Sequence, residues 1–313
     1  STYFDVNPRE ERVIEPETIT QADYISLGHA HGDHMSDAAQ VAEQTGAIVF
    51  AEKIAYNRLL NLNYEGNEYC FTDRDMKCIT DADGNPIRSS YDPLPESQLE
   101  LMNDVDIFEF DGFTVKAIHI FHSGIDDPNG PRGPNRDSFY WLDGYIANAW
   151  DDVPLTDEEV AKKDLIRSKG SGDPRIRTEG VRALLFTFGK DFTLIYYDSA
   201  STTISDSLLA AMEQIGNKTD VGLIAYAGGH SHTQVPYTMV PLKVFNPRLF
   251  IPEHHDGHWE ESTEKLFQAI RDDEDLNTQS LSLLYKEPVC FNVKSHVATK
   301  KSPLGDVWYY DMK

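Results

Sequence analysis

The chain has 313 residues, which is enough for one large domain or two small ones with a sizeable hydrophobic core. Its 52 acidic residues outnumber its 28 basic residues, and the formal net charge is −24. This balance argues against nucleic acid or an anionic membrane as the main partner, because binding to either relies on Lys and Arg. No apolar run approaches the roughly 20 residues of a membrane-spanning helix, so we expect no integral membrane segment.

The first predicted element, an apolar strand at residues 24–27, runs into a loop with the sequence Gly-His-Ala-His-Gly-Asp-His. The loop carries three imidazoles and one carboxylate, on His29, His31, Asp33 and His34. No regular helix presents all four side chains on one face, because His29 and His31 are only two residues apart. A loop can divide them between two neighbouring metal ions, and neutral imidazole suits zinc, iron and other first-row ions. The pattern therefore predicts a metal site.

Helices and strands alternate after this loop. Residues 36–60 read as a helix, a short strand and a second helix, and Gly46 follows the first helix where a C-terminal cap belongs. Residues 61–104 are polar and rich in turns. Two alternating strands follow, Val105–Phe110 and Phe113–Ile120, and the Asp-Gly pair between them is a strong hairpin signal.

The second half of the chain adds further strands and helices. The predicted strands are Ala183–Phe188, Phe192–Tyr197, Val221–Ala225 and Phe250–Pro252, and the predicted helices are about 204–215 and 261–271. Strands in each half end in candidate metal ligands. We therefore predict an α/β protein, a four-layer αββα sandwich with the site at one edge between two sheets.

Residues 124–180 form a long segment with little periodicity. We interpret it as an insertion within a single domain, residues 1–313, and as a flap over the metal site, because long loops in compact domains are typically functional. Within it, Tyr140 and Trp141 are candidates to cover an apolar part of a substrate. The alternative is that the insertion packs only on an outer face or makes a dimer contact.

Ten of the eleven histidines lie in four clusters that follow predicted strand ends, at 29/31/34, 119/122, 230/232 and 254/255/258. Scattered surface histidines would not concentrate in this way. Asp198 also ends a predicted strand, where the alternative role is a helix N-cap or a turn residue.

The run His-x-His-x-Asp-His resembles the signature of the metallo-β-lactamase superfamily. The stretches Ala22-Asp23-Tyr24-Ile25 and Gly46-Ala47-Ile48-Val49 resemble the unit that surrounds it in that family. The layout is similar to the branch that contains ascorbate-6-phosphate lactonase and other metal-dependent hydrolases, with a phospholipase D as a more distant relative. The motif is specific for the superfamily and says little about substrate.

The resemblance implies a ligand set for two metal ions. One ion would be held by His29, His31 and His122, the other by Asp33, His34 and His254, and Asp198 would bridge both together with a hydroxide. Two alternatives stay open, because His119 could replace His122 and His255 could replace His254. Zinc is the favoured metal, with manganese or iron as alternatives.

The resemblance also implies which residues face the substrate. Asp33 would orient the nucleophile and accept its proton, and His230, in a Gly-Gly-His loop, would donate a hydrogen bond to the oxyanion or leaving group. The other candidate pocket residues are His232, His255, Tyr197, Tyr140 and Trp141. Tyr197 stands where relatives carry a small residue and would narrow the pocket, whereas His232 could equally be a surface residue.

The expected activity is metal-assisted hydrolysis of a lactone, ester or amide carbonyl in a small molecule. A phosphodiesterase or phospholipase-D-like activity is the first alternative, disfavoured by the charge of −24. The second is a non-catalytic metal-binding protein, which conflicts with the retention of so many candidate ligands. A homo-oligomer stays open.

Three cysteines, Cys70, Cys78 and Cys290, are too few for a disulfide framework. Cys70 and Cys78 could pair around a local loop, but we expect buried free thiols. We expect a soluble protein and favour the cytoplasm. A periplasmic or secreted location would follow if a signal peptide had been removed, since relatives usually begin with a strand hairpin that is missing here.

Overall fold

The computed structural model of the chain describes residues 15–70, 78, 80, 83–86, 92–122, 156–158, 169–171, 173–190, 192–199, 201–226, 231–253, 260–283, 289–292, 297–301 and 307–309. Helices and strands alternate along it, which confirms the expected α/β class. The chain divides into two units, each built from two stretches: residues 1–104 with 119–182, and residues 105–118 with 183–313. The single domain and the order of its layers stay predictions.

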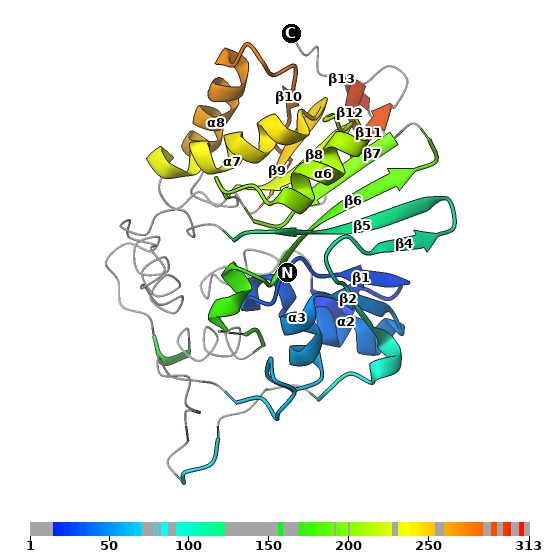
Figure 1. The fold of residues 1–313 in the computed structure, drawn as a ribbon, viewed down its shortest axis with the longest axis vertical. Helices are drawn as coiled ribbons and strands as arrows, with labels where there is room; N and C mark the ends of the chain where they lie inside the picture. The colour runs from blue at the N-terminus through cyan, green and yellow to red at the C-terminus, as the bar shows by residue number, and fades with distance from the viewer. Residues whose placement is uncertain are drawn as a thin grey trace. The chain divides into compact units, whose positions relative to one another are not determined.

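The first unit contains a three-stranded parallel sheet in the order β1-β2-β3 (Figure 1). Its strands are β1 (Tyr24–Ser26), β2 (Ile48–Ala51) and β3 (Leu99–Leu101). Its helices are α1 (Gly32–Met35), α2 (Ala38–Thr45) and α3 (Lys53–Leu59), with short 3-10 turns at Pro16–Thr18, Glu96–Gln98 and Pro174–Arg177. The carboxyl end of β1 leads directly into residues 28–34, which we call the histidine loop.

Local sequence explains how α2 and α3 begin and end. Gly46 closes α2 with φ 76°, a left-handed conformation that glycine adopts at little cost. Glu52 caps α3, and its carboxylate accepts the backbone N–H groups of Ile54 and Ala55 at 2.6 and 2.8 Å. Burial raises the pKa of Glu52 to about 7, although the two backbone hydrogen bonds oppose the shift. The helix–strand–helix prediction for residues 36–60 is confirmed.

The second unit contains a seven-stranded mixed sheet in the order β10-β9-β8-β7-β6-β5-β4. Its strands are β4 (Ile107–Phe110), β5 (Phe113–Ile120), β6 (Val181–Phe188), β7 (Phe192–Tyr197), β8 (Val221–Ala225), β9 (Leu249–Glu253) and β10 (Gln279–Ser280). Strands β7 to β10 run parallel to one another, whereas β4–β5 and β6–β7 are antiparallel pairs. A smaller antiparallel sheet is formed by β11 (Val289–Asn292), β12 (Val297–Lys301) and β13 (Val307–Tyr309).

The described part of the second unit also contains three helices, and α6 and α7 lie over one face of the larger sheet in Figure 1. They are α6 (Asp206–Gln214), α7 (Ser231–Phe245) and α8 (Glu260–Asp272). The core of this unit includes Val221, Leu249, Ile251 and Leu281, which are buried together. None of the helices in the described part of the chain has the length and apolar character needed to cross a bilayer.

The predicted bounds of β7 and β8 are confirmed, but several elements were not predicted, among them α7 and β3. Helix α7 continues through Pro236 and Pro241, and a proline inside a helix normally predicts its end. Strand β3 is short and lies within residues 61–104, a stretch that is polar and rich in turns. Val105 has a φ of 61°, so the first hairpin strand begins at Ile107 and not at Val105.

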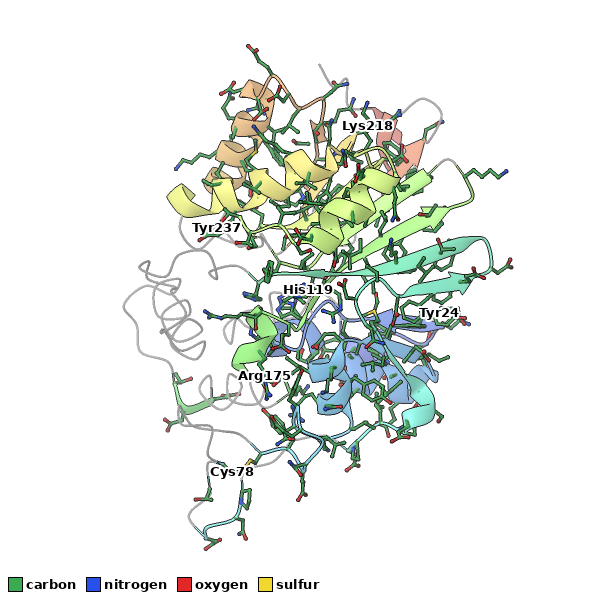
Figure 2. All side chains as sticks on the ribbon, in the orientation of Figure 1. Tyr24, Cys78, His119, Arg175, Lys218 and Tyr237 are labelled. Carbon is green, nitrogen blue, oxygen red and sulfur yellow. A yellow bond between two sulfur atoms is a disulfide. The ribbon has the colours of Figure 1, made fainter. Side chains whose placement is uncertain are left out.

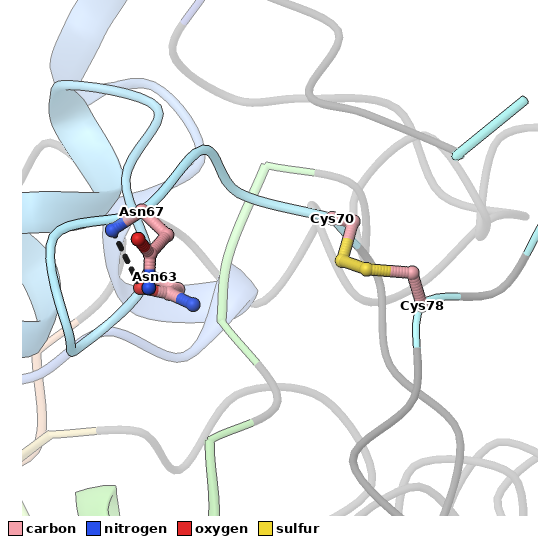
Figure 3. The surroundings of a disulfide bond; sticks show 4 residues. All are labelled: Asn63, Asn67, Cys70 and Cys78. Atoms are coloured by element: carbon pink, nitrogen blue, oxygen red, sulfur yellow. Dashed lines mark hydrogen bonds between the residues drawn. A yellow bond between two sulfur atoms is a disulfide. The ribbon is translucent and has the colours of Figure 1, made fainter.

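The expectation of buried free thiols is wrong for the pair near the first unit's polar loop. Cys70 and Cys78 form a disulfide with their Cα atoms 5.5 Å apart (Figure 3). Cys78 is exposed, as is the free Cys290. A neighbouring turn, where the backbone N–H of Asn67 donates to Asn63 Oδ1 at 2.9 Å, precedes the disulfide. The two cysteines are eight positions apart in the sequence, so the disulfide closes a short local loop.

A thiol titration checks this pairing. The denatured, unreduced protein should show one reactive thiol per chain, from Cys290, and reduction should raise the count to three. A Cys290→Ser variant is the control and should show none before reduction. Three thiols without a reductant would contradict the disulfide.

Candidate metal centre

The backbone of the histidine loop is an extension of β1. The N–H of Leu27 donates to Phe50 O at 2.9 Å and continues the pairing with β2, and the N–H of Arg182 donates to Gly28 O at 2.8 Å. His29 is completely buried. His31 has extended backbone angles and stands immediately before α1. The loop thus carries His29 and His31 outside any helix, as the residue spacing predicts.

The third histidine comes from the end of β5. His122 lies two residues beyond the strand, and its backbone N–H donates to Arg177 O at 3.0 Å. His119, labelled in Figure 2, takes part in different contacts. Its backbone N–H donates to Asp104 Oδ1 at 2.7 Å, and its ring Nε2 lies 2.7 Å from Thr178 O. Of the two candidates, the structure brings His122 to His29 and His31.

The three imidazoles of His29, His31 and His122 form a compact cluster within the first unit. One ring nitrogen from each lies within 4.8 Å of the other two. The closest pair is His29 Nε2 and His31 Nδ1, which are 3.0 Å apart. The ring centroids are separated by 4.7 Å for His29–His31, 5.0 Å for His29–His122 and 4.7 Å for His31–His122.

This cluster fits a first-row metal ion. Burial lowers the pKa of His31 well below its ordinary value, and the neighbouring imidazoles of His122 and His29 lower it further, so its ring is neutral at pH 7. Neutral imidazole is the form that binds metal. Two donor atoms on a tetrahedral zinc ion lie roughly 3.3 Å apart at Zn–N distances of about 2.0–2.1 Å, close to the 3.0 Å between His29 and His31.

Asp33 and His34 lie in the single turn of α1, next to the cluster. The ring centroid of His34 is 3.9 Å from that of His29, and His34 Nε2 is 3.5 Å from Asp33 Oδ2. Both side chains are mostly buried. They therefore add a fourth imidazole and a carboxylate beside the three clustered histidines.

Asp198 belongs to the second unit and follows the last residue of β7. Its side chain is buried, and the phenol of Tyr196 donates a short hydrogen bond to Asp198 Oδ1. Burial raises the pKa of Tyr196 well above its ordinary value, and the charges of Asp198 and Glu253 raise it further. The phenol is therefore a stable donor that fixes one oxygen of the carboxylate.

Strand register places Asp198 at the carboxyl edge of three parallel strands. Tyr197 pairs with Ile224 of β8, and Ala225 pairs with Glu253 of β9. Asp198 therefore stands at the same level as Glu253, the residue before His254. Asp198 and Glu253 therefore lie at the same carboxyl edge of the sheet.

Tyr196 is a site residue that sequence analysis missed. Neighbouring residues of a strand point to opposite faces, so the side chain on the face of Asp198 is that of Tyr196 and not of Tyr197. Tyr197 is completely buried and packs against Phe245 of α7 with ring centroids 5.3 Å apart. Because side chains alternate between the two faces of a strand, the sequence alone could have identified Tyr196 as the residue on the face of Asp198.

Several predicted site residues lie outside the described part of the chain, namely His230, His254, His255, Tyr140 and Trp141. His232 lies in α7, but its side chain is not among those described. Their roles, and the flap at residues 124–180, stay predictions.

No protein-family model and no curated protein matches the chain. Among solved structures, it is similar to the metallo hydrolase Igni18 from the hyperthermophilic archaeon Ignicoccus hospitalis, with 14% identity over 93% of this chain and 81% of the other and a TM-score of 0.42. It is also similar to an isothiocyanate hydrolase from Delia radicum gut bacteria, with 11% identity, coverages of 89% and 80%, and a TM-score of 0.47. A third is the metallo-β-lactamase fold protein YhfI from Bacillus subtilis, with 11% identity, coverages of 87% and 77%, and a TM-score of 0.40.

The assignment of His122 can be tested against His119. Replacing His122 with Ala removes one of three clustered nitrogens, so the bound metal per chain should fall after gentle purification and dialysis. His119→Ala is the matched control from the same strand end and should keep the wild-type metal content. Elemental analysis measures both. The reverse result would make His119 the ligand.

Proposed function

We propose that this chain is a metal-dependent hydrolase that acts on a lactone, ester or amide carbonyl of a small molecule. The observation that carries the proposal is the cluster of His29, His31 and His122, whose ring nitrogens lie within 4.8 Å of one another. A structural zinc site would favour cysteine ligands and four closed positions. A site of histidines at strand ends, with Asp33 and His34 beside it, suits catalysis better.

We propose that two metal ions bind. His29, His31 and His122 would hold one, Asp33, His34 and His254 would hold the other, and Asp198 would contact both. Divalent ions at such a site supply Lewis acidity and a water molecule of lowered pKa. The proposal is supported by the number of candidate ligands, because one ion needs only three or four.

The protein's own groups would then orient the reactants and move protons. Asp33 would hold the nucleophilic water in line and accept its proton. His230 would donate a hydrogen bond to the oxygen that gains charge as the carbonyl is attacked. His232 and His255, with Tyr140 and Trp141 of the flap, would shape the substrate pocket, whereas Tyr197 packs against Phe245 on the other face of β7 from Asp198 and is no longer a candidate.

The net charge of the protein bears on the substrate class. A protein with a net charge of −24 repels polyanions at long range, which supports a small carbonyl substrate over a polyanionic phosphodiester such as a nucleic acid. No basic surface is needed for such a partner.

We propose a cellular compartment for the protein from the disulfide between Cys70 and Cys78. Disulfides persist in oxidising compartments and are rare in the cytosol, so the Cys70–Cys78 pair supports a periplasmic or secreted location over the cytoplasm favoured by the sequence. One free thiol per chain in the titration above would support export, and three would support the cytoplasm.

Metal analysis and a substrate panel test the function together. Protein reconstituted with zinc, manganese or iron should carry close to two ions per chain and hydrolyse at least one member of a panel of lactones, esters, β-lactams and phosphodiesters. His29→Ala should lose both properties. One ion or none after reconstitution would contradict the binuclear site. Turnover of phosphodiesters alone would contradict the substrate class, and two bound ions without any turnover would favour a binding protein.

Tyr196→Phe tests the proposed role of Asp198. Loss of the phenol removes the hydrogen bond that fixes Asp198 Oδ1, and such outer partners of metal ligands typically contribute about 10–100-fold in metal affinity. We expect a loss of this size in a chelator-competition titration. Thr193→Val is the matched control, because it removes a hydroxyl–carboxylate hydrogen bond to Asp220 near the start of the same strand. Equal affinities in wild type and Tyr196→Phe would contradict a role of this hydrogen bond in metal binding.

A further inference from the structure

One segment of the first unit contacts the backbone on both sides of the histidine cluster. We call it the clamp segment and define it as residues 169–171 and 173–182. It includes the described end of the predicted insertion and the start of β6. Its contacts are made mainly through backbone atoms, so sequence motifs do not reveal them.

The closest contact joins Gly170 to Gly32. A Cβ atom on Gly170 would lie 2.2 Å from Gly32 N, 2.4 Å from Gly32 Cα and 2.9 Å from the carbonyl carbon of His31. All three are backbone atoms and cannot move as a side chain can. Only glycine therefore fits at position 170. Gly32 lies between His31 and Asp33, so any displacement there shifts two of the proposed ligands.

Three backbone hydrogen bonds join the clamp segment to the residues around the cluster. The N–H of Ser171 donates to Ala30 O at 2.8 Å, between His29 and His31. The N–H of Arg182 donates to Gly28 O at 2.8 Å, and Arg177 O accepts the N–H of His122 at 3.0 Å. Each of the three clustered histidines is thus held directly or through its neighbour by the same segment.

The clamp segment is itself fixed by Arg58 of α3. Arg58 is completely buried, its Nε donates to Gly170 O at 2.8 Å, and its Nη1 donates to Asn61 Oδ1 at 3.0 Å. Its guanidinium carbon lies 3.9 Å from the centroid of the Tyr69 ring. A buried charge is costly unless it is well hydrogen-bonded, so this arrangement is stable only while Gly170 O stays in place.

A second anchor holds the middle of the segment. Arg175, labelled in Figure 2, donates to Glu65 at 2.8 Å, and its guanidinium lies 3.8 Å from the centroid of the Tyr64 ring. Arg58 lies in α3, and the partners of Arg175, Tyr64 and Glu65, lie in the stretch that follows this helix. The clamp segment is therefore tied to α3 and the residues after it on one side and to the histidine loop on the other.

We propose that Gly170 and Arg58 are positioning residues that set the spacing of His29, His31 and His122 and so determine metal affinity. The inference rests on the proposed function, because it assumes that these histidines bind metal. A metal site needs its donor atoms close to their bonding distances, within about 0.2 Å, and binding geometry is preserved only where the backbone is held. Neither residue touches the metal or the substrate.

The test compares Gly170→Ala with Gly222→Ala. Position 222 lies in β8 of the second unit, outside the clamp segment, and a Cβ there would lie 3.1 Å from Pro247 Cγ and 3.2 Å from Pro247 Cβ, so the substitution crowds a buried position without touching the histidine loop. Zinc affinity is measured by competition with a chromophoric chelator, thermal unfolding of the metal-free proteins measures stability, and the visible spectrum of Co²⁺-loaded protein reports ligand geometry.

We expect Gly170→Ala to weaken zinc binding about 10–100-fold and to change the Co²⁺ spectrum. Gly222→Ala changes packing only in the second unit, so it should keep the wild-type affinity and spectrum whatever its effect on the unfolding temperature. Equal affinities in wild type and Gly170→Ala, or equal losses in the two glycine variants, would overturn the proposal. If Gly170→Ala does not fold, Arg58→Met decides, because it removes the hydrogen bonds to Gly170 O and Asn61 Oδ1: weaker zinc binding supports the proposal and unchanged binding overturns it.

The wild-type protein separates this inference from the proposed function. If it binds no zinc or Co²⁺, both the function and the positioning role are overturned. If it binds metal and the variants bind equally well, only the positioning role fails.

Discussion

The close packing of imidazole rings at the end of β1 is the constraint on which the rest of the site depends. His29 has no exposed surface, and one nitrogen from each of His29, His31 and His122 lies within 4.8 Å of the other two. Three protonated rings at that separation would repel one another strongly in a buried environment. The cluster is compatible with neutral rings, each of which brings one nitrogen close to the other two. A cation beside these nitrogens is the partner that their lone pairs favour.

The backbone around the cluster is arranged to keep this geometry. Hydrogen bonds from the clamp segment reach Gly28 O, Ala30 O and the N–H of His122, so the loop after β1 and the end of β5 share one support. The hydrogen bonds of the clamp segment are directional, whereas apolar packing contributes much of the stability of the strands. The sheet can therefore provide stability while these hydrogen bonds set the positions of the metal ligands.

Much of this arrangement could be predicted from the sequence, because it depends on short-range patterns. The run that starts at His29, the strand ends before His122 and Asp198, and the short apolar runs of β7 and β8 are all local signals. Other features depend on contacts between distant residues. The approach of Gly170 to Gly32 and the buried bond from Arg58 to Gly170 leave no periodic trace. Helix α7 was missed because its two prolines signal a break, and the Cys70–Cys78 disulfide was not favoured because three cysteines are too few for a disulfide framework.

X-ray absorption at the zinc edge of zinc-loaded protein tests the central claim most directly, because it reads the ligands of the bound ion. The trihistidine cluster predicts nitrogen neighbours at about 2.0–2.1 Å with the outer-ring scattering of at least three imidazoles per chain. His122→Ala should lower the imidazole contribution of the same spectrum. A shell of oxygen atoms without imidazole scattering would contradict the account, since it would mean that zinc binds elsewhere on this acidic protein.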